Sequence, residues 1–477
     1  MPQSLPLASR APASLPRVAV IGAGSSGITG LKGFVDAGLD AVCYEKSDRV
    51  GGNWAYRNPN GMSAAYRSLH INTSRGRMAY RDYPMPADYP AFPHHSQIKT
   101  YFDDYVDHFG LRDRIRFGCG VASAVRRDDG VWEVTDEHGG TEEFDAVVVA
   151  NGHHWDPRWP EPAFPGSDEF RGIQMHAHSY DEPEQFLDSD VVVVGMGNSA
   201  MDIATELSWT PGNVYLSMRR GAYILPKYIA GKPLDDLTPE WLTRQIAKLP
   251  FKVRQLLNRK VFDRYMGDMQ DYGLPKPDHK LLEAHPTISD VILSRITHGR
   301  VVPKPQISHF TAEHVHFTDG TSVHADAVIY ATGYRVSFPF FDPEFLSAPD
   351  NELPLYRRVF SPDVDGVFFL ALLQPLGATM PLAEAQGRWV ADYLRGRYQL
   401  PSREVMRSEM AADRARMRKR YVASKRHTMQ VDFDSYLVEL EREQKKGRRR
   451  AAEAGHPLPI PGRAWRGASQ GAATRTT

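Results

Sequence analysis

Cysteine is nearly absent from the sequence, which has only Cys43 and Cys119 among 477 residues. Two distant cysteines without a CxxC pair exclude a disulfide framework, a cysteine-rich zinc site and a dithiol redox centre. The sequence also lacks any apolar run near the roughly 20 residues that a membrane-spanning helix needs. Lysine plus arginine and aspartate plus glutamate balance at 58 each, so bulk charge gives no reason to expect a nucleic-acid or membrane-surface partner.

The two ends of the chain have the composition of unfolded segments. Residues 1–16 are rich in proline, serine and alanine and lack an apolar h-region, so we expect a disordered leader, with a transit peptide as the weaker alternative and a cytoplasmic location by default. Residues 451–477 are expected to form a disordered tail. The charged residues 403–450 indicate helices with a solvated face or, alternatively, a polyanion-binding tail. The 18 histidines show no metal-ligand spacing, so we expect no metal.

The first strong pattern is a strand, a glycine-rich turn and a helix near the N-terminus. The apolar residues 18–21 are followed by Gly22, Gly24 and Gly27 in GxGxxG spacing, and a second apolar run ends at Glu45. The first glycine permits a tight turn, the second lets the backbone approach a pyrophosphate, and the third lets the helix pack on the strand. The acid after the second strand suits ribose hydroxyls. Together these features predict a dinucleotide site rather than a purely structural glycine turn.

A second unit of the same kind contains Gly195 and Gly197, with Ala200 in the permitted third place. Its second strand ends in "LSMRRG", whose polar residues are Ser217, Arg219 and Arg220. Arginines in place of an acid suit a ribose 2′-phosphate, so we expect this site to prefer NADP(H) to NAD(H). The alternative is a surface arginine pair without a cofactor role.

Two dinucleotide sites in one chain, with the acid-bearing one first, imply FAD followed by NADPH and hydride transfer to the flavin. The expected fold class is α/β, with two Rossmann-like dinucleotide-binding domains and the NADP domain inserted in the FAD domain. The expected boundaries are 17–165 for the first part of the FAD domain, 166–330 for the NADP domain with a mainly helical insertion at about 234–295, and 331–450 for the second part of the FAD domain with C-terminal helices. Because a CxxC pair is absent, the electrons would pass to a carrier protein or to molecular oxygen.

The segment between the two units carries a family fingerprint. The sequence "FRGIQMHAHSY" fits Phe-x-Gly-x-x-x-His-x-x-x-Tyr, with Phe170, Gly172, His176 and Tyr180 in place. This pattern resembles the fingerprint of the flavin-containing monooxygenases, class B flavoproteins with separate FAD and NADP domains. Other blocks agree, among them "GGNW", "NTSRGRMAYRDYPMPADYP", "GMGNSAMDIA", "YATGY" and "LLQPLGATMPLAEAQGRW". The resemblance covers residues 17–443.

The resemblance implies an oxidoreductase of the N,N-dimethylaniline monooxygenase type, in the animal-type N- and S-oxygenating branch. Such an enzyme uses NADPH and O2 to oxygenate a soft nucleophile, an amine nitrogen or a thioether sulfur, through an FAD C4a-hydroperoxide. One alternative is a Baeyer–Villiger ketone monooxygenase, whose pattern usually closes with Trp or Pro where this chain has Tyr180. Another is a non-oxygenating NADPH/flavin redox sensor. The implied partners are a small-molecule amine or sulfide and O2, without nucleic acid or membrane; a homodimer is a further option.

The resemblance also assigns residues to the site. It implies that Asn72 faces the reacting part of the flavin, where a neutral amide can donate and accept hydrogen bonds without a titrating proton. On the residues alone, Asn72 would be a turn residue. His176 is expected to hydrogen-bond within the linker, and residues 386–389 to open a helix. The cofactor-binding residues expected in the first unit are Gly22, Gly24, Ser25, Ser26, Gly27, Glu45, Lys46, Gly52, Asn53, Trp54, Asn72 and Thr73. Those expected further along are Gly195, Gly197, Asn198, Ser199, Ser217, Arg219, Arg220, Thr332, Gly333 and Gln374.

Overall fold

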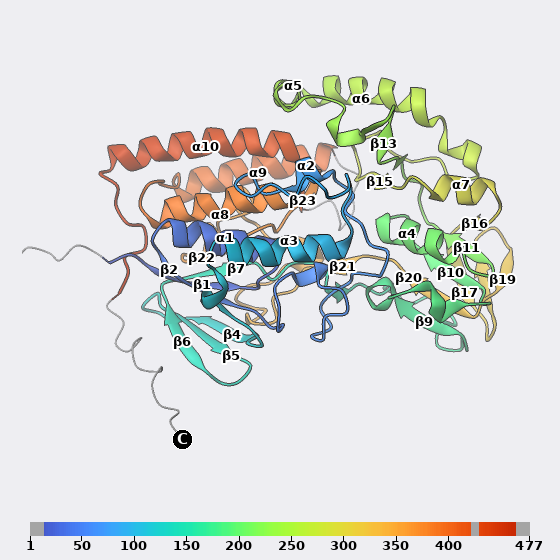
Figure 1. Cartoon of the computed structure of the whole chain (residues 1–477), viewed down its shortest axis with the longest axis horizontal. Helices are drawn as coiled ribbons and strands as arrows, with labels where there is room; N and C mark the ends of the chain where they lie inside the picture. Colours follow the sequence, from blue (N-terminus) through green and yellow to red (C-terminus); the bar gives the residue numbers. More distant parts are fainter. Residues whose placement is uncertain (1–13, 421–428, 464–477) are drawn as a thin grey trace, which may run out of the picture.

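The computed structural model describes residues 14–420 and 429–463. Two parallel sheets with flanking helices stand side by side along the long axis of the molecule (Figure 1). Most of the expected leader, at residues 1–13, and the last part of the expected tail, at residues 464–477, lie outside the described residues.

The first sheet has the strand order β22-β7-β1-β2-β3, and all its pairings are parallel. Its strands are β1 (Arg17–Ile21), β2 (Asp40–Tyr44), β3 (Ile115–Arg116), β7 (Ala146–Val149) and β22 (Val367–Phe369). The four residues of β7 are apolar and all buried, as expected when both faces of a parallel sheet are covered. Because β22 follows the second sheet in sequence, the first unit is built from both ends of the chain.

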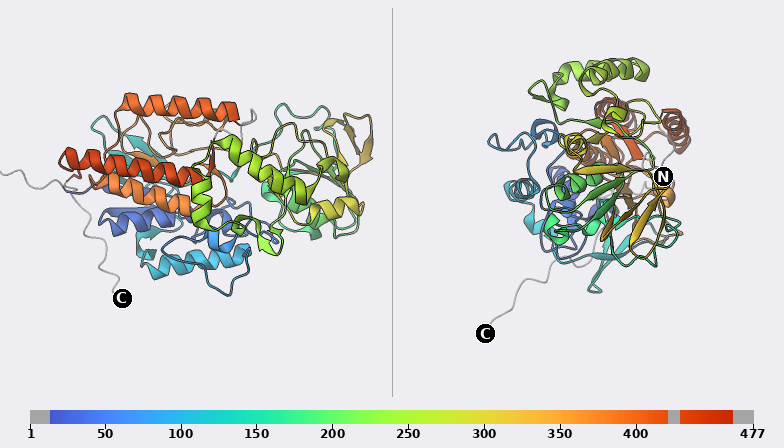
Figure 2. Two further views of the ribbon diagram at one scale, coloured as in Figure 1. Left: turned by 90° about the horizontal axis from the view of Figure 1, so that it is seen from above. Right: turned by 90° about the vertical axis from the view of Figure 1, so that its right-hand side faces the viewer.

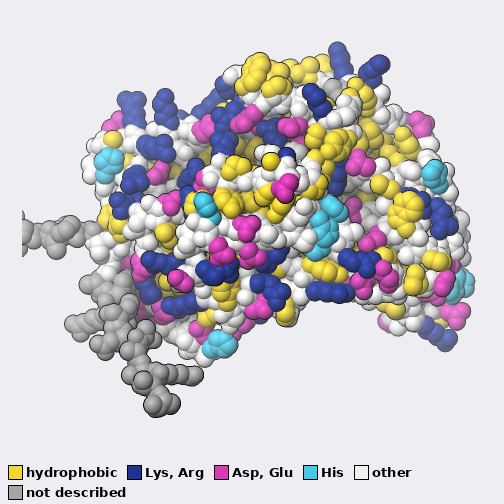
Figure 3. All heavy atoms as spheres, viewed as in Figure 1, with side chains coloured by type: hydrophobic (Ala, Val, Ile, Leu, Met, Phe, Trp, Pro, Cys, Tyr) yellow, Lys and Arg dark blue, Asp and Glu magenta, His cyan; other side chains and the backbone are white. Residues whose placement is uncertain are grey.

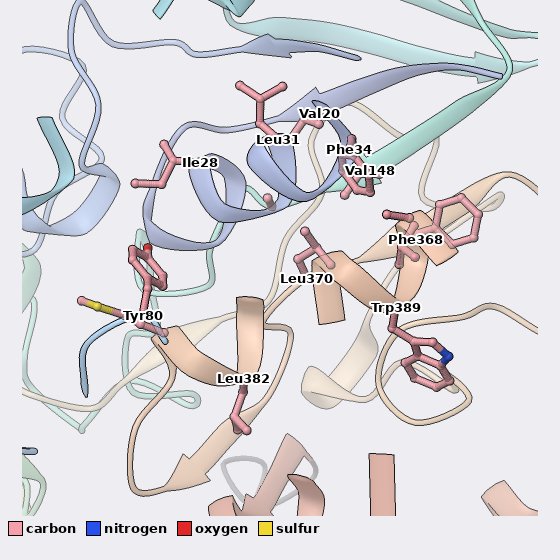
Figure 4. Packing of buried hydrophobic residues seen from close by; sticks show 14 of the residues in the cluster. Val20, Ile28, Leu31, Phe34, Tyr80, Val148, Phe368, Leu370, Leu382 and Trp389 are labelled. Carbon is pink, nitrogen blue, oxygen red and sulfur yellow. The ribbon is translucent and has the colours of Figure 1, made fainter. Parts of the chain in front are cut away.

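Helices cover one face of this sheet, and a small antiparallel sheet covers the other. The helices are α1 (Ser25–Asp36), α3 (His95–His108) and α8 (Met380–Leu394); the small sheet contains β4 (Val121–Arg126), β5 (Trp132–Asp136) and β6 (Thr141–Phe144) (Figure 1). Helices α1 and α8 are in close contact, since a β-carbon on Gly387 would lie 2.9 Å from Cα of Gly30. Figure 4 shows the apolar cluster that joins Ile28, Leu31 and Phe34 of α1 to the sheet and to Trp389 of α8.

The second sheet repeats this arrangement with the order β16-β11-β10-β20-β9, again entirely parallel. Its strands are β9 (Ile173–His176), β10 (Val191–Val194), β11 (Val214–Ser217), β16 (Val301–Lys304) and β20 (Ala327–Tyr330). Helices α4 (Asn198–Leu207) and α7 (Ile292–Thr297) pack on one face. The other face is covered by the antiparallel strands β17 (Ile307–Phe310), β18 (His314–Phe317) and β19 (Ser322–His324).

The residues between β11 and α7 form a mainly helical region on one side of the molecule. Its elements are β12 (Ile224–Leu225), β13 (Tyr228–Ile229), β14 (Lys232–Pro233), η5 (Leu234–Asp236), α5 (Glu240–Ile246), α6 (Phe251–Met266), η6 (Met269–Tyr272) and β15 (Thr287–Ile288). Both Figure 1 and Figure 2 place α5 and α6 outside the two sheets. Figure 3 shows apolar side chains gathered over these helices, and the exposed ones are Trp241, Leu249, Val253, Leu256, Leu257 and Tyr265.

The C-terminal part differs from the expectation of a tail that is disordered from residue 451. Helix α9 (Arg403–Arg420) is followed by β24 (Gln430–Asp432) and by α10 (Phe433–Glu453), which packs against α8. Residues beyond α10 are fixed up to residue 463: the Gly462 amide donates to the Ser14 carbonyl at 2.8 Å, and Arg463 forms an ion pair with Asp129 at 3.3 Å. The same contact orders Ser14, inside the stretch expected as a leader. The two ends of the described chain are therefore in contact, which composition alone does not reveal.

Residues 386–389 do not open a helix, contrary to the expectation. Helix α8 begins at Met380, and Gln386 is a fully buried residue near its middle. The Gln386 side chain accepts a hydrogen bond from the Ala371 amide and donates one to the Tyr436 hydroxyl, both at 2.7 Å. Gln386 does not mark a helix start, because its hydrogen-bond partners lie in other elements. Among the helices of the described chain, none is both long and apolar enough to cross a membrane.

Candidate cofactor and active site

The first glycine-rich turn joins β1 to α1 where the backbone is too crowded for side chains. Gly22 has a φ of +101°, and a β-carbon there would lie 2.8 Å from the carbonyl oxygen of Ala150. A β-carbon on Gly27 would lie 1.7 Å from the carbonyl oxygen of Gly22. Both positions therefore require glycine.

The N-terminus of α1 is open beside this turn. Gly24 is the N-cap residue, Ser25 and Ser26 follow it, and no side chain in the described part of the chain caps the helix. Gly52 lies against this end, since a β-carbon on Gly52 would be 3.1 Å from Cα of Gly24. Free N–H groups and the positive end of the helix dipole thus lie between two residues without side chains. This arrangement fits a diphosphate.

Glu45 follows β2 and is 6% exposed. Its Oε2 accepts a hydrogen bond from the Ala23 amide at 2.6 Å, and its Oε1 accepts one from the Ser47 amide at 2.7 Å. Burial raises the pKa of the Glu45 carboxyl above its ordinary value, against the lowering effect of these two N–H donors. Because an ionised carboxylate has about four acceptor positions, Glu45 keeps acceptors for ribose hydroxyls next to the glycine turn.

The second glycine-rich turn joins β10 to α4 and is similarly crowded. Gly195 has a φ of +144°, and a β-carbon on it would lie 2.6 Å from the carbonyl oxygen of Ala331. Gly197 is the N-cap residue of α4, again without a side-chain cap among the described residues, and Ser199 lies in the first helical turn. This helix end offers the same kind of anion site as the first.

Strand β15 braces the second turn from the helical region. The Thr287 hydroxyl donates to the carbonyl oxygen of Met196 at 2.6 Å. The Ile288 amide donates to Oδ1 of Asn198 at 2.9 Å. Asn198, which is predicted to bind a cofactor, therefore uses its side-chain oxygen to fix the turn. Its side-chain NH2 group is left to donate to a ligand.

Of the three polar residues predicted at the end of β11, only Arg219 has no side-chain partner in the described part of the chain. The buried Ser217 hydroxyl donates to the carbonyl oxygen of Pro305 at 2.9 Å, and Arg220 forms an ion pair with Asp278 at 2.6 Å. Arg219 is exposed and makes no hydrogen bond or ion pair with any other described residue. Ser217 and Arg220 therefore already have protein partners, whereas Arg219 has none among the described residues.

Asn72 lies in the loop before α2 (Arg75–Met78), where the first unit meets the helical region. The loop is held here by the Ser74 amide, which donates to Oδ2 of Asp235 at 2.7 Å, and Thr73 is buried. Oδ1 of Asn72 is buried and has no hydrogen-bond partner within the described chain. A buried unpaired acceptor costs about 1–3 kcal/mol. The Asn72 oxygen is therefore free, within the described chain, to accept a hydrogen bond from a bound group or a water molecule.

Two predicted residues near the first turn are engaged by the protein itself. Lys46 is exposed and forms an ion pair with Glu137 at 2.7 Å. Oδ1 of Asn53 accepts a hydrogen bond from the Ala64 amide at 2.8 Å, which fixes the loop that follows η1 (Gly52–Trp54). Trp54 is half-buried and packs at the edge of the first core.

The later predicted residues lie where the chain passes between the units. The Thr332 hydroxyl donates to the carbonyl oxygen of Arg158 at 2.5 Å, and Gly333 has a φ of +88°. These residues precede β21 (Tyr334–Arg335), which pairs with β8 (Asp156–Pro157). Gln374 begins β23 (Gln374–Leu376), opposite Gln430 of β24.

The fingerprint segment is structural in its described contacts. The His178 amide donates to Nδ1 of His176 at 3.0 Å, so the hydrogen bond expected within the linker is present. Nε2 of His178 lies 2.9 Å from the carbonyl oxygen of Gly61, which ties the linker to the first unit. The buried Tyr180 donates its hydroxyl to Glu206 of α4 at 2.9 Å. Burial lowers the pKa of His176 to about 4, so this imidazole is neutral at pH 7.

A buried contact between the two units has no counterpart among the predictions from the sequence. The Tyr66 hydroxyl, from the first unit, donates to Oδ2 of Asp202 on α4 at 2.5 Å, and Tyr66 is 4% exposed. Burial raises the pKa of Asp202 to about 6, against the lowering effects of Tyr66 and the Lys227 charge. The sequence signal that could have indicated this contact is the position of Asp202 in α4, where an acid lies among alanine, methionine and isoleucine.

Comparisons with known proteins agree with this geometry. A family model described as flavin-binding monooxygenase-like matches residues 15–446. Flavin-containing monooxygenase 5 from Rattus norvegicus is 40% identical over 439 residues, which cover 89% of this chain and 82% of the relative. Dimethylaniline monooxygenase (N-oxide-forming) 2 from the same organism is 34% identical over 438 residues, with the same shares. Among solved structures, S-allyl-L-cysteine S-oxygenase from Allium sativum matches with a TM-score of 0.68, 26% identity and 92% of both chains.

Proposed function

We propose that this chain, which belongs to the flavin-binding monooxygenase-like family, oxygenates soft nucleophiles. The nucleophile is the amine nitrogen or the thioether sulfur of a small molecule. The chain is an NADPH-dependent FAD monooxygenase. Two names support this substrate class. One relative is named as an N-oxide-forming dimethylaniline monooxygenase, and one structural neighbour as an S-oxygenase of S-allyl-L-cysteine.

The observation that carries the proposal is the buried, unpaired Oδ1 of Asn72. This side chain belongs to the first unit, yet its loop is held by Asp235 of the region inserted in the second unit. A group bound by both units would therefore meet Asn72. A neutral amide there can hold a hydrogen bond to the reacting oxygen without adding a proton that titrates near neutral pH.

The described residues fit both cofactors. FAD would be held by its diphosphate at the open N-terminus of α1, between Gly24 and Gly52, and by its ribose at Glu45. NADPH would be held at the N-terminus of α4, with its 2′-phosphate at Arg219. Once reduced by NADPH, FAD supplies the transfer of one oxygen atom from O2 to the substrate.

The reaction makes a modest demand on side chains. An amine nitrogen or a thioether sulfur carries its own lone pair and attacks an electrophilic oxygen without a general base. The protein must bind and orient the substrate and the cofactors, and it must exclude water from the site. This agrees with a site whose key polar group, Asn72, is an amide rather than an acid or a histidine.

The direct test compares three substrate classes with the purified holoenzyme under NADPH and air. We expect an N-oxide from N,N-dimethylaniline or a sulfoxide from a simple thioether, formed in proportion to the NADPH consumed. Ester formation from a cyclic ketone as the dominant activity would replace the proposal with Baeyer–Villiger chemistry. NADPH oxidation that yields only hydrogen peroxide with every substrate would favour a redox-sensing role.

The surroundings of the enzyme are also part of the proposal. We propose a cytoplasmic homodimer, on the resemblance to the family and on a sequence without a charge bias toward nucleic acid or membrane. Light scattering after size exclusion should give twice the monomer mass, and a single-chain mass would refute the dimer. Recovery in the membrane fraction after cell lysis would refute the location.

A further inference from the structure

Lys227 reaches from the second unit to the residue before Asn72. It follows β12, and its Nζ donates to the carbonyl oxygen of Ile71 at 3.2 Å. The same ammonium lies 5.2 Å from the centre of the Phe92 ring. Ile71 is 1% exposed, so this contact holds the buried start of the loop that carries Asn72.

The other side of that loop is held by the same stretch of chain. Eight residues after Lys227, Oδ2 of Asp235 accepts from the Ser74 amide at 2.7 Å, and the Asp235 carbonyl oxygen accepts from Nε of Arg77 at 3.2 Å. Asn72 and Thr73 therefore lie between two contacts that come from one segment of the helical region.

This segment is also joined to the NADPH turn. Strand β12 pairs with β15, and β15 holds the second glycine-rich turn through Thr287 and Ile288. A continuous set of hydrogen bonds thus runs from the turn at Met196 and Asn198, through the strand pair, to Lys227. The loop that carries Asn72 and the second glycine-rich turn are therefore both attached to the pair of strands β12 and β15.

We propose that Lys227 is a positioning residue that fixes the Asn72 loop relative to the NADPH turn, with Asp235 as the second contact. This inference rests on the proposed function of Asn72. The consequence is that the amide of Asn72 is oriented by the unit that binds NADPH, rather than by its own unit alone.

The charge of Lys227 argues against a role in packing only. An apolar side chain would fill this half-buried place without the cost of desolvating an ammonium. That cost is partly offset by two acids: burial lowers the pKa of Lys227 below its ordinary value, against the raising effect of the Asp202 and Asp290 carboxylates. Asp290 is close, because its Oδ1 accepts from the Lys227 backbone amide at 2.7 Å. The Lys227 charge therefore has its acidic neighbours, Asp202 and Asp290, in the second unit, while its Nζ donates to the carbonyl oxygen of Ile71 in the first unit.

The test uses hydrogen–deuterium exchange on the FAD-loaded full chain, together with NADPH kinetics. In Lys227→Met, we expect amides in residues 70–76 to exchange about tenfold faster, with more NADPH oxidised to hydrogen peroxide and an unchanged KM for NADPH. Lys227→Arg should restore both readouts because it keeps a charged donor. Lys248→Met is the matched control, since Lys248 is exposed in the same region and bonds only to Gln245 among the described residues.

A second pair of variants covers the case in which Lys227→Met does not fold. Asp235→Ala should also loosen residues 70–76, whereas Asp236→Ala, one residue along and exposed, should not. Wild-type exchange in both Lys227→Met and Asp235→Ala would overturn the inference, as would extra peroxide without faster exchange. If the enzyme oxygenates no amine or thioether at all, the proposed function fails, but exchange still tests the contact at Lys227.

Discussion

The carbonyl oxygen of Gly22 fills the place that a β-carbon on Gly27 would occupy, at 1.7 Å from that position. The contact closes the turn between β1 and α1, so the helix meets the strand with no room for a side chain. The same turn carries the open helix end that fits the FAD diphosphate.

Gly27→Ala should therefore damage both stability and FAD binding. The obstacle is backbone, which cannot rotate away as a side chain can, so we expect a loss at the upper end of the usual overpacking cost, about 3 kcal/mol. Urea unfolding and FAD content after purification measure the two effects. Gly76→Ala is the control, because a β-carbon on Gly76 would have nothing within 4 Å. Wild-type FAD content in Gly27→Ala would show that the turn can shift.

Asn72→Ala should separate oxygen transfer from the reductive half of the reaction. We expect normal FAD binding and normal reduction by NADPH, because the glycine turns are untouched. Without the amide, NADPH oxidation should yield hydrogen peroxide in place of oxygenated substrate. Peroxide and product are measured together against NADPH consumed.

The control for this variant is Asn258→Ala, an exposed position on α6 whose amide donates to the Arg254 carbonyl oxygen. Product formation by Asn72→Ala at the wild-type ratio to NADPH would remove Asn72 from the mechanism.

Arg219→Ala should raise the KM for NADPH by about 10- to 100-fold, the range for the loss of a charged hydrogen bond of about 1.5–3 kcal/mol. The KM for NADH should change little, since NADH lacks the 2′-phosphate. Arg220→Ala provides the comparison within the same loop, and we expect a smaller effect because Arg220 is paired with Asp278. Equal losses with NADPH and NADH would mean that Arg219 does not read the phosphate.

Asp202→Asn should change how stability depends on pH. The pKa of Asp202 is raised from 3.8 to about 6 in the folded protein, so the folded state binds this proton more tightly than the unfolded state. Stability from this group is therefore full below about pH 4 and is lost as pH rises through about 6, a change of up to about 3 kcal/mol. Asparagine keeps an acceptor for Tyr66 but does not titrate.

Chemical unfolding between pH 4.5 and pH 7.5, sampled at roughly four values, measures this effect. The free energy of unfolding of Asp202→Asn should increase relative to that of the wild type as pH rises. Asp168→Asn, at an exposed position, should show the wild-type dependence on pH. Parallel curves for Asp202→Asn and the wild type would place the titration elsewhere.

The local geometry of both cofactor turns could be predicted from the sequence. Gly22, Gly27 and Gly195 are required by sterics within a few residues of each turn, and buried strands such as β7 and β10 are short runs of apolar residues. Steric rules and hydrophobic periodicity act over short distances along the chain, so they leave a readable pattern. The family fingerprint around His176 belongs to the same class of local information.

The tertiary structure alone decided which polar side chains are free to act. Ser217 and Arg220 match the expected cofactor pattern as well as Arg219 does. Of the three, only Arg219 lacks a partner among the described residues. Lys46 fits the sequence block but is paired with Glu137 on the surface. Such pairings depend on neighbours that the local pattern does not contain.

The contacts that hold Asn72 are the clearest case. Lys227 and Ile71 are 156 residues apart, and Ser74 and Asp235 are 161 residues apart. The sequence by itself determined where the chain turns, which strands are buried and which cofactors the turns suit. Only folding determined which distant residues meet, because a hydrogen bond between two elements depends on how both pack, and the sequence near either residue does not identify its partner.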